Sequence, residues 1–263
     1  MFFAWFKHRR RRKILADPFP PGWHTILREN VRHYDLLADA DQKKLRDAVQ
    51  IILAEKDWEG CRGLEVTDEV RVTIAALAGV LVLGFDDFYF DNVQTILVYP
   101  DEYVAPVETA IAGGATMEEE SERLGEAHQR GPIILAWAEV RENAWQPGHG
   151  QNLVFHEFAH QLDMLNGAFD GTPDLPTPDL RERWAKIMDA EYRRLQRAER
   201  HGRRTVLDPY GATDPAEFFE VTTECFFDAP RAMKAAYPHL YELFRDYYRQ
   251  DPAAWPTFEM DHP

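Results

Sequence analysis

The sequence of 263 residues contains only two cysteines, Cys61 and Cys225. Two thiols exclude a disulfide framework and a four-thiolate zinc site, and they indicate a reducing compartment. The chain also lacks a long apolar run, because the longest one, from Ile74 to Phe85, has twelve residues. A membrane-spanning helix needs about 20 such residues. The sequence therefore predicts no membrane span.

Basic charge is scarce over most of the chain. Its 45 acidic residues outnumber the 30 basic ones, which gives a net charge of -15. Six of the basic residues lie within residues 1–13, where there is no acidic residue, so the remainder is still more acidic. Such a surface repels phosphates over most of its area, which argues against direct binding of nucleic acid.

The first residues, MFFAWFKHRRRRK, place apolar side chains before the basic block, the reverse of an export signal. With the scarcity of cysteine, this order predicts a cytoplasmic protein. We expect residues 1–20 to form a basic and aromatic arm that is disordered and solvated. The alternative is that this arm contacts an anionic membrane or an acidic partner.

The hydrophobic pattern predicts many helices and few strands. Helices are expected at about 40–57, 67–84, 151–166, 180–200, 215–228 and 237–249. Strands are expected at 93–99 and 132–140, and a polar loop or hairpin at 113–131. We therefore predict an α+β fold in which a small mixed sheet packs against several helices.

The expected domain organisation has two parts after the arm. A mainly helical region over 21–90 packs on a catalytic region over 91–263. The alternative is one continuous domain over 21–263. Nothing in the pattern indicates a repeat or a coiled coil, so we expect a monomer.

The segment HEFAH, at residues 156–160, is the clearest chemical motif. On a helix, His156 and His160 share a face and present two imidazole nitrogens to one point. Zinc accepts such ligands, and Glu157 is placed to take a proton from a water molecule on the metal. The alternative is a buried polar network without a metal, which requires partners for all three side chains.

A third ligand is needed for such a site. Glu217, Glu220 and Glu224 lie on one stripe of the predicted helix at 215–228, among apolar residues. Glu217 also fits a capping box with Asp214, so the pattern leaves ligand and cap equally open, with Glu224 as the rival ligand. The histidine candidates, none of which has a distinctive spacing, are His128, His149, His201 and His239.

A family resemblance distinguishes these candidates. HEFAHQLD and the later LDPYGATDPAEFFEVTTECFF resemble the Mlc titration factor A family of zinc peptidases. These peptidases are glutamate-liganded zincins whose catalytic core resembles that of the anthrax lethal factor. The resemblance implies one Zn²⁺ per chain, bound by His156, His160 and Glu217. It also implies that Glu157 is catalytic and that Tyr210 lies beside the metal.

The expected function is therefore a zinc metallopeptidase that hydrolyses peptide or protein substrates, either as an aminopeptidase or on short peptides. Glu157 acts as general base, and the hydroxyl of Tyr210 stabilises the oxyanion. We expect Asp163 or Glu224 to orient a ligand histidine, with a surface salt bridge as the alternative for Asp163. The strand at 132–140 is expected to pair with extended substrate, or to be an ordinary core strand.

Two other functions are considered. The family takes its name from sequestering a transcriptional repressor, Mlc, so the chain can instead be a regulatory binding protein that captures such a repressor. An acidic surface suits a basic DNA-binding partner. A closed, purely structural metal site is the third reading, and it is disfavoured because closed zinc sites prefer thiolates.

Overall fold

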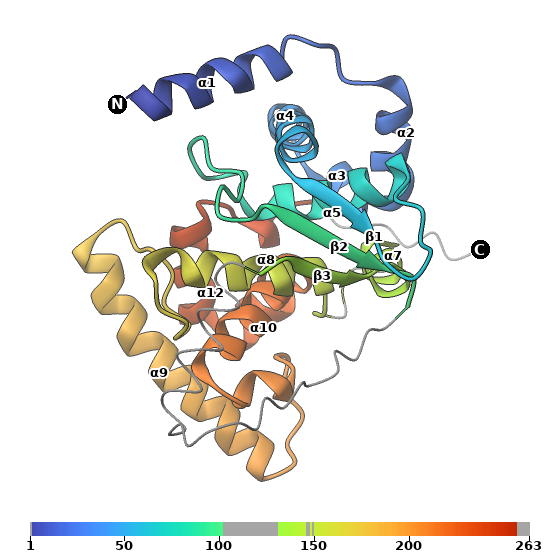
Figure 1. Ribbon diagram of the computed structural model, residues 1–263. Helices are drawn as coiled ribbons and strands as arrows, with labels where there is room; N and C mark the ends of the chain where they lie inside the picture. Colours follow the sequence, from blue (N-terminus) through green and yellow to red (C-terminus); the bar gives the residue numbers. More distant parts are fainter. Residues whose placement is uncertain (1, 102–130, 146–147, 149, 257–263) are drawn as a thin grey trace, which may run out of the picture.

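The computed structural model describes residues 2–101, 131–145, 148 and 150–256. The expected loop at 113–131, apart from its last residue, and the candidates His128 and His149 lie outside these residues. The described part is mostly helical, with one small sheet (Figure 1). In Figure 1, α1 and α4 lie above this sheet, α8 lies level with β3, and α10 and most of α9 lie below it.

Among the described residues, five helices precede β2, and six helices and three 3₁₀ turns follow β3. The first five are α1 (Phe2–Ile14), α2 (Pro21–Asn30), α3 (Arg32–Leu36), α4 (Asp39–Glu55) and α5 (Asp68–Leu81). The next are α7 (Trp137–Trp145), α8 (Leu153–Asp163), α9 (Pro178–Arg200), α10 (Pro215–Asp228), α11 (Pro230–Ala236) and α12 (Pro238–Tyr248). The 3₁₀ turns are η1 (Met164–Asn166), η2 (Pro209–Ala212) and η3 (Pro252–Ala254).

The sheet has three described strands in the order β1 (Asp57–Gly60), β2 (Thr95–Tyr99) and β3 (Ile133–Ala136). Both pairings are parallel, with Ile96 of β2 opposite Trp58 on one side and Ile133 on the other. We expected a mixed sheet. This prediction is wrong for the described strands, because both of their pairings are parallel. The broader α+β expectation is compatible with this architecture.

Helix α5 is the apolar centre of the fold, as the run from Ile74 predicts. It starts at Thr67, whose side chain accepts a hydrogen bond from the N–H of Val70 at 3.4 Å. It packs on α4 so closely that a Cβ on Gly79 would lie 2.7 Å from a methyl carbon of Leu45. On its other side it contacts α8, so α5 links the amino-terminal helices to the helix of the HEFAH motif.

The expected strand at 132–140 is only half right. The chain is extended from Ile133 to Ala136 and then turns into α7 at Trp137. An apolar run of this length fits a buried strand or a buried helix segment equally well, which is why the pattern did not reveal the boundary.

The amino-terminal arm is a helix rather than a disordered segment. The guanidinium of Arg11 is 3% exposed and pairs with Glu55 at 2.7 Å, with Asp87 at 3.0 Å and with Asp91. These contacts fasten α1 to the end of α4 and to the 86–91 segment. Trp5 and Phe6, nearer the start of α1, are more than half exposed.

One cluster of buried apolar side chains extends from Leu27 to Tyr248. Across the described residues we find no helix with the length and apolarity that a membrane crossing requires. The division of the chain into regions 21–90 and 91–263 stays a prediction.

Candidate metal centre

Helix α8 carries the HEFAH motif and is built to hold it in a buried position. Asn152 begins the helix, because its side-chain oxygen accepts the N–H of Phe155 at 3.1 Å. Phe155, Phe158 and the other apolar residues of α8 face the core. This burial fixes the rotation of the helix, so His156 and His160 lie on the same partly exposed face, with ring centroids 4.8 Å apart.

Helix α10 brings the first carboxylate to these histidines. Asp214 begins α10 by accepting the N–H of Glu217 at 3.0 Å, and Pro215 occupies the first helical position. The side chain of Glu217 extends the other way, and its Oε2 lies 3.3 Å from Nε2 of His156. The cap uses the backbone N–H of Glu217 and leaves its carboxylate free to face the histidines. A role in the cap and a role as metal ligand are therefore compatible for this residue.

His156, His160 and Glu217 together form a group that suits a metal ion. Each contributes one ligand atom, and the three atoms lie within 4.8 Å of one another. Oε2 of Glu217 is buried without a hydrogen-bond partner. Two imidazoles and one carboxylate are a usual donor set for a zinc ion with an open position. A buried carboxylate oxygen that accepts no hydrogen bond is what such a cation would satisfy.

Glu224 supports His156 from behind. Nδ1 of His156 donates to Oε1 of Glu224 at 2.8 Å, and this hydrogen bond leaves Nε2 facing Glu217. The second oxygen of Glu224 accepts the N–H of Asn152 at 2.5 Å. The carboxylate therefore fixes both the histidine ring and the first turn of α8, which is the kind of support that ligand histidines usually have.

Glu220 lies beside the other histidine. Its Oε1 is 3.0 Å from Nδ1 of His160, but the two groups are not aligned for a hydrogen bond. Glu220 is fully buried, and burial raises the pKa of its carboxyl well above the usual value. The sequence reasoning placed Glu220 on the acidic stripe but gave it no role. The sequence did contain a signal for such a role: Glu220 and Glu224 follow Glu217 by three and seven positions, which places all three on one face of the helix.

Asp163 does not contact either histidine through a described hydrogen bond. It is fully buried, and its Oδ2 accepts the N–H of Gly171 at 2.9 Å. Burial and the charge of Glu220 raise the pKa of Asp163 to about 7. In place of a surface salt bridge, Asp163 fastens the loop after α8, and Gly171 in turn accepts a hydrogen bond from Nε1 of Trp184 at 3.0 Å.

Tyr210 reaches the group from the turn η2. Asp208 accepts its backbone N–H at 2.8 Å, and its hydroxyl donates to Oε1 of Glu217 at 3.1 Å. Burial and the carboxylate of Glu217 raise the pKa of Tyr210 to about 12, so the hydroxyl stays protonated and can donate. Tyr210 is nevertheless 54% exposed, which leaves it accessible to a substrate.

The electrostatics of the group are dominated by carboxylates. Burial lowers the pKa of His156, but the contacts with Glu217 and Glu224 outweigh burial and raise it to about 11. Burial and the charge of His156 lower the pKa of His160. Glu157, half-buried on α8, acts on both histidines through its charge. More acidic than basic groups converge here, and a divalent cation would balance them.

The remaining histidine candidates lie elsewhere. His201 and His239 are exposed on the surface, at the end of α9 and in the first turn of α12. Neither belongs to the described group of three potential ligands.

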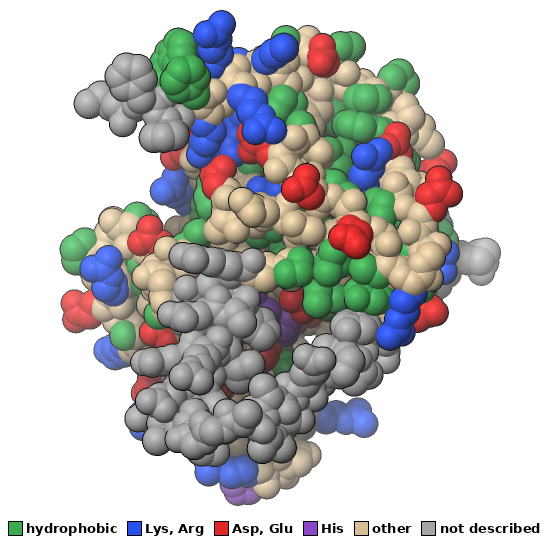
Figure 2. Space-filling model, viewed as in Figure 1, with side chains coloured by type: hydrophobic (Ala, Val, Ile, Leu, Met, Phe, Trp, Pro, Cys, Tyr) green, Lys and Arg blue, Asp and Glu red, His purple; other side chains and the backbone are tan. Residues whose placement is uncertain are grey.

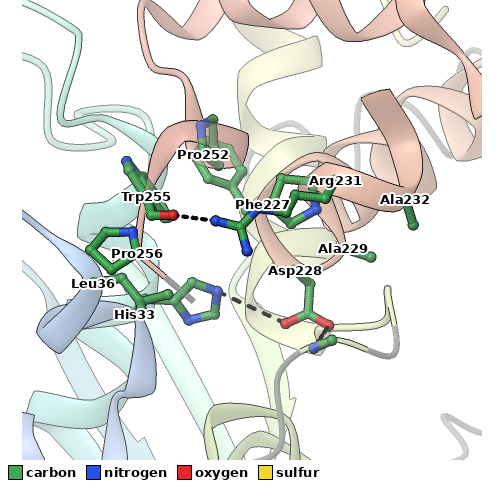
Figure 3. A pocket seen from close by; sticks show the side chains of 12 residues that line it. His33, Leu36, Phe227, Asp228, Ala229, Arg231, Ala232, Pro252, Trp255 and Pro256 are labelled. Carbon is green, nitrogen blue, oxygen red and sulfur yellow. Dashed lines mark hydrogen bonds and ion pairs between the residues drawn. The ribbon is translucent and has the colours of Figure 1, made fainter. Parts of the chain in front are cut away.

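A separate pocket of about 250 Å³ lies at the end of α10 (Figure 3). Figure 3 shows His33 and Asp228 facing each other there, with Oδ1 of Asp228 3.9 Å from Nε2 of His33. The other oxygen of Asp228 accepts the N–H groups of Gly148 and Gly150 at 2.8 and 2.9 Å. Asp228 therefore secures the segment that leads into α8.

The sequence is similar to those of several known proteins. The sequence model of the family described as glucose-regulated metallo-peptidase M90 matches residues 5–249. An uncharacterized protein of Synechocystis sp. is 39% identical over 246 residues, which cover 92% of this chain and 89% of that protein. Mlc titration factor A of Serratia proteamaculans is 33% identical over 255 residues, 96% of this chain and 94% of that protein. Mlc titration factor A of Yersinia pestis is 28% identical over 270 residues, 99% and 96% of the two chains.

Proposed function

Because this chain belongs to the glucose-regulated metallo-peptidase M90 family, we propose that it is a zinc-dependent peptidase. The observation that carries the proposal is the convergence of His156, His160 and Glu217 from two helices, with their ligand atoms within 4.8 Å. The proposed substrates are peptides or short protein segments, cleaved as by an aminopeptidase or within the chain. With two cysteines, both free thiols, we place the enzyme in the cytoplasm.

His156, His160 and Glu217 would hold one zinc ion, which supplies Lewis acidity toward the substrate carbonyl and toward water. Glu224 keeps His156 in the correct tautomer, because it accepts the proton of Nδ1 at 2.8 Å. This hydrogen bond makes Nε2 the nitrogen that is available as ligand.

Glu157 is the proposed general base. Its carboxylate takes a proton from the attacking water while the water oxygen bonds to the carbonyl carbon of the substrate. It then donates that proton to the amine nitrogen as the carbon–nitrogen bond breaks. Glu157 suits this role because it lies on α8 directly between the two histidines in sequence, and is half-buried near them.

The hydroxyl of Tyr210 is the proposed donor to the oxyanion that develops on the carbonyl oxygen. In the structure it donates to Oε1 of Glu217 at 3.1 Å, so it must exchange this acceptor for the substrate. Its large exposure makes this exchange easy. Strand β3 comes last in the described sheet order, and we propose that an extended substrate pairs with it through backbone hydrogen bonds.

The test is the variant Glu157→Gln, assayed on chromogenic aminoacyl and peptide substrates. The amide keeps the size of the side chain but cannot accept the proton, so we expect activity to fall about 10²-fold or more with zinc content unchanged. Chelation of the wild-type protein should abolish activity, and added zinc should restore it.

Glu182→Gln is the matched control, because Glu182 is exposed on α9 and far from the motif in sequence. It should retain full activity. A zinc-loaded Glu157→Gln protein that cleaves as fast as wild type would disprove the proposed mechanism.

A second candidate function is regulatory binding, with hydrolysis secondary. It is favoured by the name of the relatives, Mlc titration factor A, and by the net charge of -15, which suits a basic DNA-binding repressor. Capture of such a repressor by the Glu157→Gln variant, with its full biological effect, would support binding over catalysis. Loss of the effect together with hydrolysis would support the peptidase.

A further inference from the structure

Basic side chains gather at the end of α9, on a chain that is acidic overall. Figure 2 shows blue side chains and a histidine at the lower end of the molecule, where α9 ends in Figure 1. Five of them border a hollow of about 410 Å³, which we call the α9 basic pocket. They are Arg194, Arg197, His201, Arg203 and Arg204. The acidic balance of the chain is therefore reversed at this place.

One of these arginines is held in position. Nη1 of Arg194 donates to the carbonyl oxygen of Ala236 at 3.1 Å, and its guanidinium carbon lies 4.3 Å from the centre of the Tyr237 ring. It also pairs with Glu191 at 3.1 Å. Tyr237 is buried, so the stacked arginine has a fixed wall behind it. Arg194 therefore offers a pre-oriented cation to the hollow.

The other arginines have no such partners. In the part of the chain that the structure describes, the side chains of Arg197, Arg203 and Arg204 form no hydrogen bond or ion pair. All three are exposed. Cations at the end of α9 balance the helix dipole, but Arg203 and Arg204 lie beyond the last helical residue, Arg200. Several unpaired like charges around one hollow repel one another unless an anion lies between them.

We propose that the α9 basic pocket binds a small molecule that carries phosphate groups. Guanidinium groups present paired N–H donors that match phosphate oxygens, and phosphate needs several of them at once. The volume of the hollow lies in the range of about 300–1,000 Å³ that is usual for small-ligand sites. A concave site favours such a compact anion over an extended acidic protein surface, and the acidic remainder of the chain disfavours nucleic acid.

The pocket is joined to the metal centre by a short segment. Thr205 and Val206 line the hollow, and the chain continues through Asp208, which accepts the N–H of Tyr210. A bound anion that neutralises Arg203 and Arg204 would fix this segment, and with it the turn that carries Tyr210. Binding itself does not depend on the proposed peptidase activity.

The test is calorimetric titration of the full-length protein with pyrophosphate, and with inorganic phosphate, at constant ionic strength. We expect saturable binding to wild type, stronger for pyrophosphate. The double variant Arg203→Ala/Arg204→Ala should bind roughly tenfold more weakly or worse. Arg203→Lys/Arg204→Lys, which keeps the charge but not the paired donors, should lie between them. Hydrogen exchange should slow at residues 203–213 when pyrophosphate is added.

Arg183→Ala/Arg193→Ala is the matched control, because it removes the same charge from ion-paired positions on α9. It should bind as wild type does. If the control variant bound pyrophosphate as weakly as Arg203→Ala/Arg204→Ala, the loss of affinity would come from net charge alone, and the proposal would be overturned. Binding that survives in Arg203→Ala/Arg204→Ala would place pyrophosphate elsewhere, as at the metal, and would also overturn it. So would binding of a poly-glutamate peptide in place of pyrophosphate.

Discussion

Glu224 accepts the Nδ1 proton of His156 at 2.8 Å, while its other oxygen accepts the N–H of Asn152, the residue that caps α8. One carboxylate thus sets both the tautomer of a ligand histidine and the start of the helix that carries it. The position of this carboxylate comes from α10, which also supplies Glu217. The two helices are consequently joined at the metal centre twice.

Replacement of this carboxylate tests its role. In Glu224→Gln one oxygen remains where the carboxylate offers two, so the amide cannot accept both the Nδ1 proton of His156 and the N–H of Asn152. Because His156 loses its acceptor, we expect the affinity for zinc to fall about 10–100-fold. The fold should persist, because the amide can still accept the N–H of Asn152. Competition against a chromogenic chelator measures the affinity, with Glu182→Gln as the control. Unchanged zinc affinity in Glu224→Gln would show that His156 needs no such support.

Tyr210→Phe separates catalysis from metal binding. The hydroxyl donates to Glu217 but is not among the proposed ligands, so zinc content should stay at one ion per chain. If the hydroxyl stabilises the oxyanion, kcat should fall about 10²–10³-fold with little change in KM. Steady-state kinetics on a peptide substrate, together with metal analysis, check both parts. An equal fall in zinc content would instead assign Tyr210 to the support of Glu217.

Arg11→Ala should release α1 from the body of the protein. Arg11 is the buried partner of Glu55, Asp87 and Asp91, and its loss leaves three carboxylates close together. Two of these are about one-third exposed, so we expect a loss of about 1–3 kcal/mol in unfolding free energy rather than the full cost of a buried charge. Urea unfolding measures it, and limited proteolysis should cleave near residues 14–18.

Arg12→Ala provides the comparison for this change, because Arg12 is exposed and next in sequence. Its unfolding free energy should lie within about 0.5 kcal/mol of wild type. Equal stability of Arg11→Ala and Arg12→Ala would show that the buried cluster contributes nothing.

Lys56 gives the stability a dependence on alkaline pH. Its ammonium is buried and donates to the carbonyls of Phe90 and Val93 at 2.5 and 2.9 Å. Burial lowers its pKa from 10.5 to about 8. The folded protein therefore loses this proton at a lower pH than the unfolded chain, so unfolding takes up a proton between these two pKa values. Stability must rise with pH across that window.

Unfolding free energies at pH 8 and pH 10.5 measure this contribution. Relative to Lys56→Met, the wild type should gain at most about 3 kcal/mol over this interval. Lys43→Met, at an exposed lysine paired with Asp47, should behave as wild type. Parallel pH profiles for wild type and Lys56→Met would show that the lysine titrates normally.

The sequence predicted the convergence of His156, His160 and Glu217 better than the contacts around them. The resemblance to the Mlc titration factor A family is confirmed by the family match and by the relatives. His156 and His160 could be recognised because helical periodicity alone brings them together. The pairing of Glu220 with His160 could not, because it depends on how α10 packs against α8, and that packing is set by contacts distant in the sequence.

The prediction that the amino-terminal segment is disordered is wrong for the same reason. Residues 1–13 contain no acidic partner, and the acids that fix Arg11 follow 44 to 80 positions later. The local sequence alone therefore predicts a solvated basic arm, whereas in the fold the segment is a helix held by Arg11 against the rest of the protein. The parallel pairing of β1, β2 and β3 was likewise invisible, because strand patterns give burial but not the direction of the neighbouring strand.

Helix α10 has one further property that follows from its spacing. Glu217, Glu220, Glu224 and Asp228 occupy successive turns, and all four contact α8 or the segment that leads into it. Insertion or deletion of one residue inside this helix would rotate every later side chain by about 100°. All contacts beyond that point would then be lost together, whereas a substitution removes only one. The length of α10 is therefore a stricter requirement than its composition.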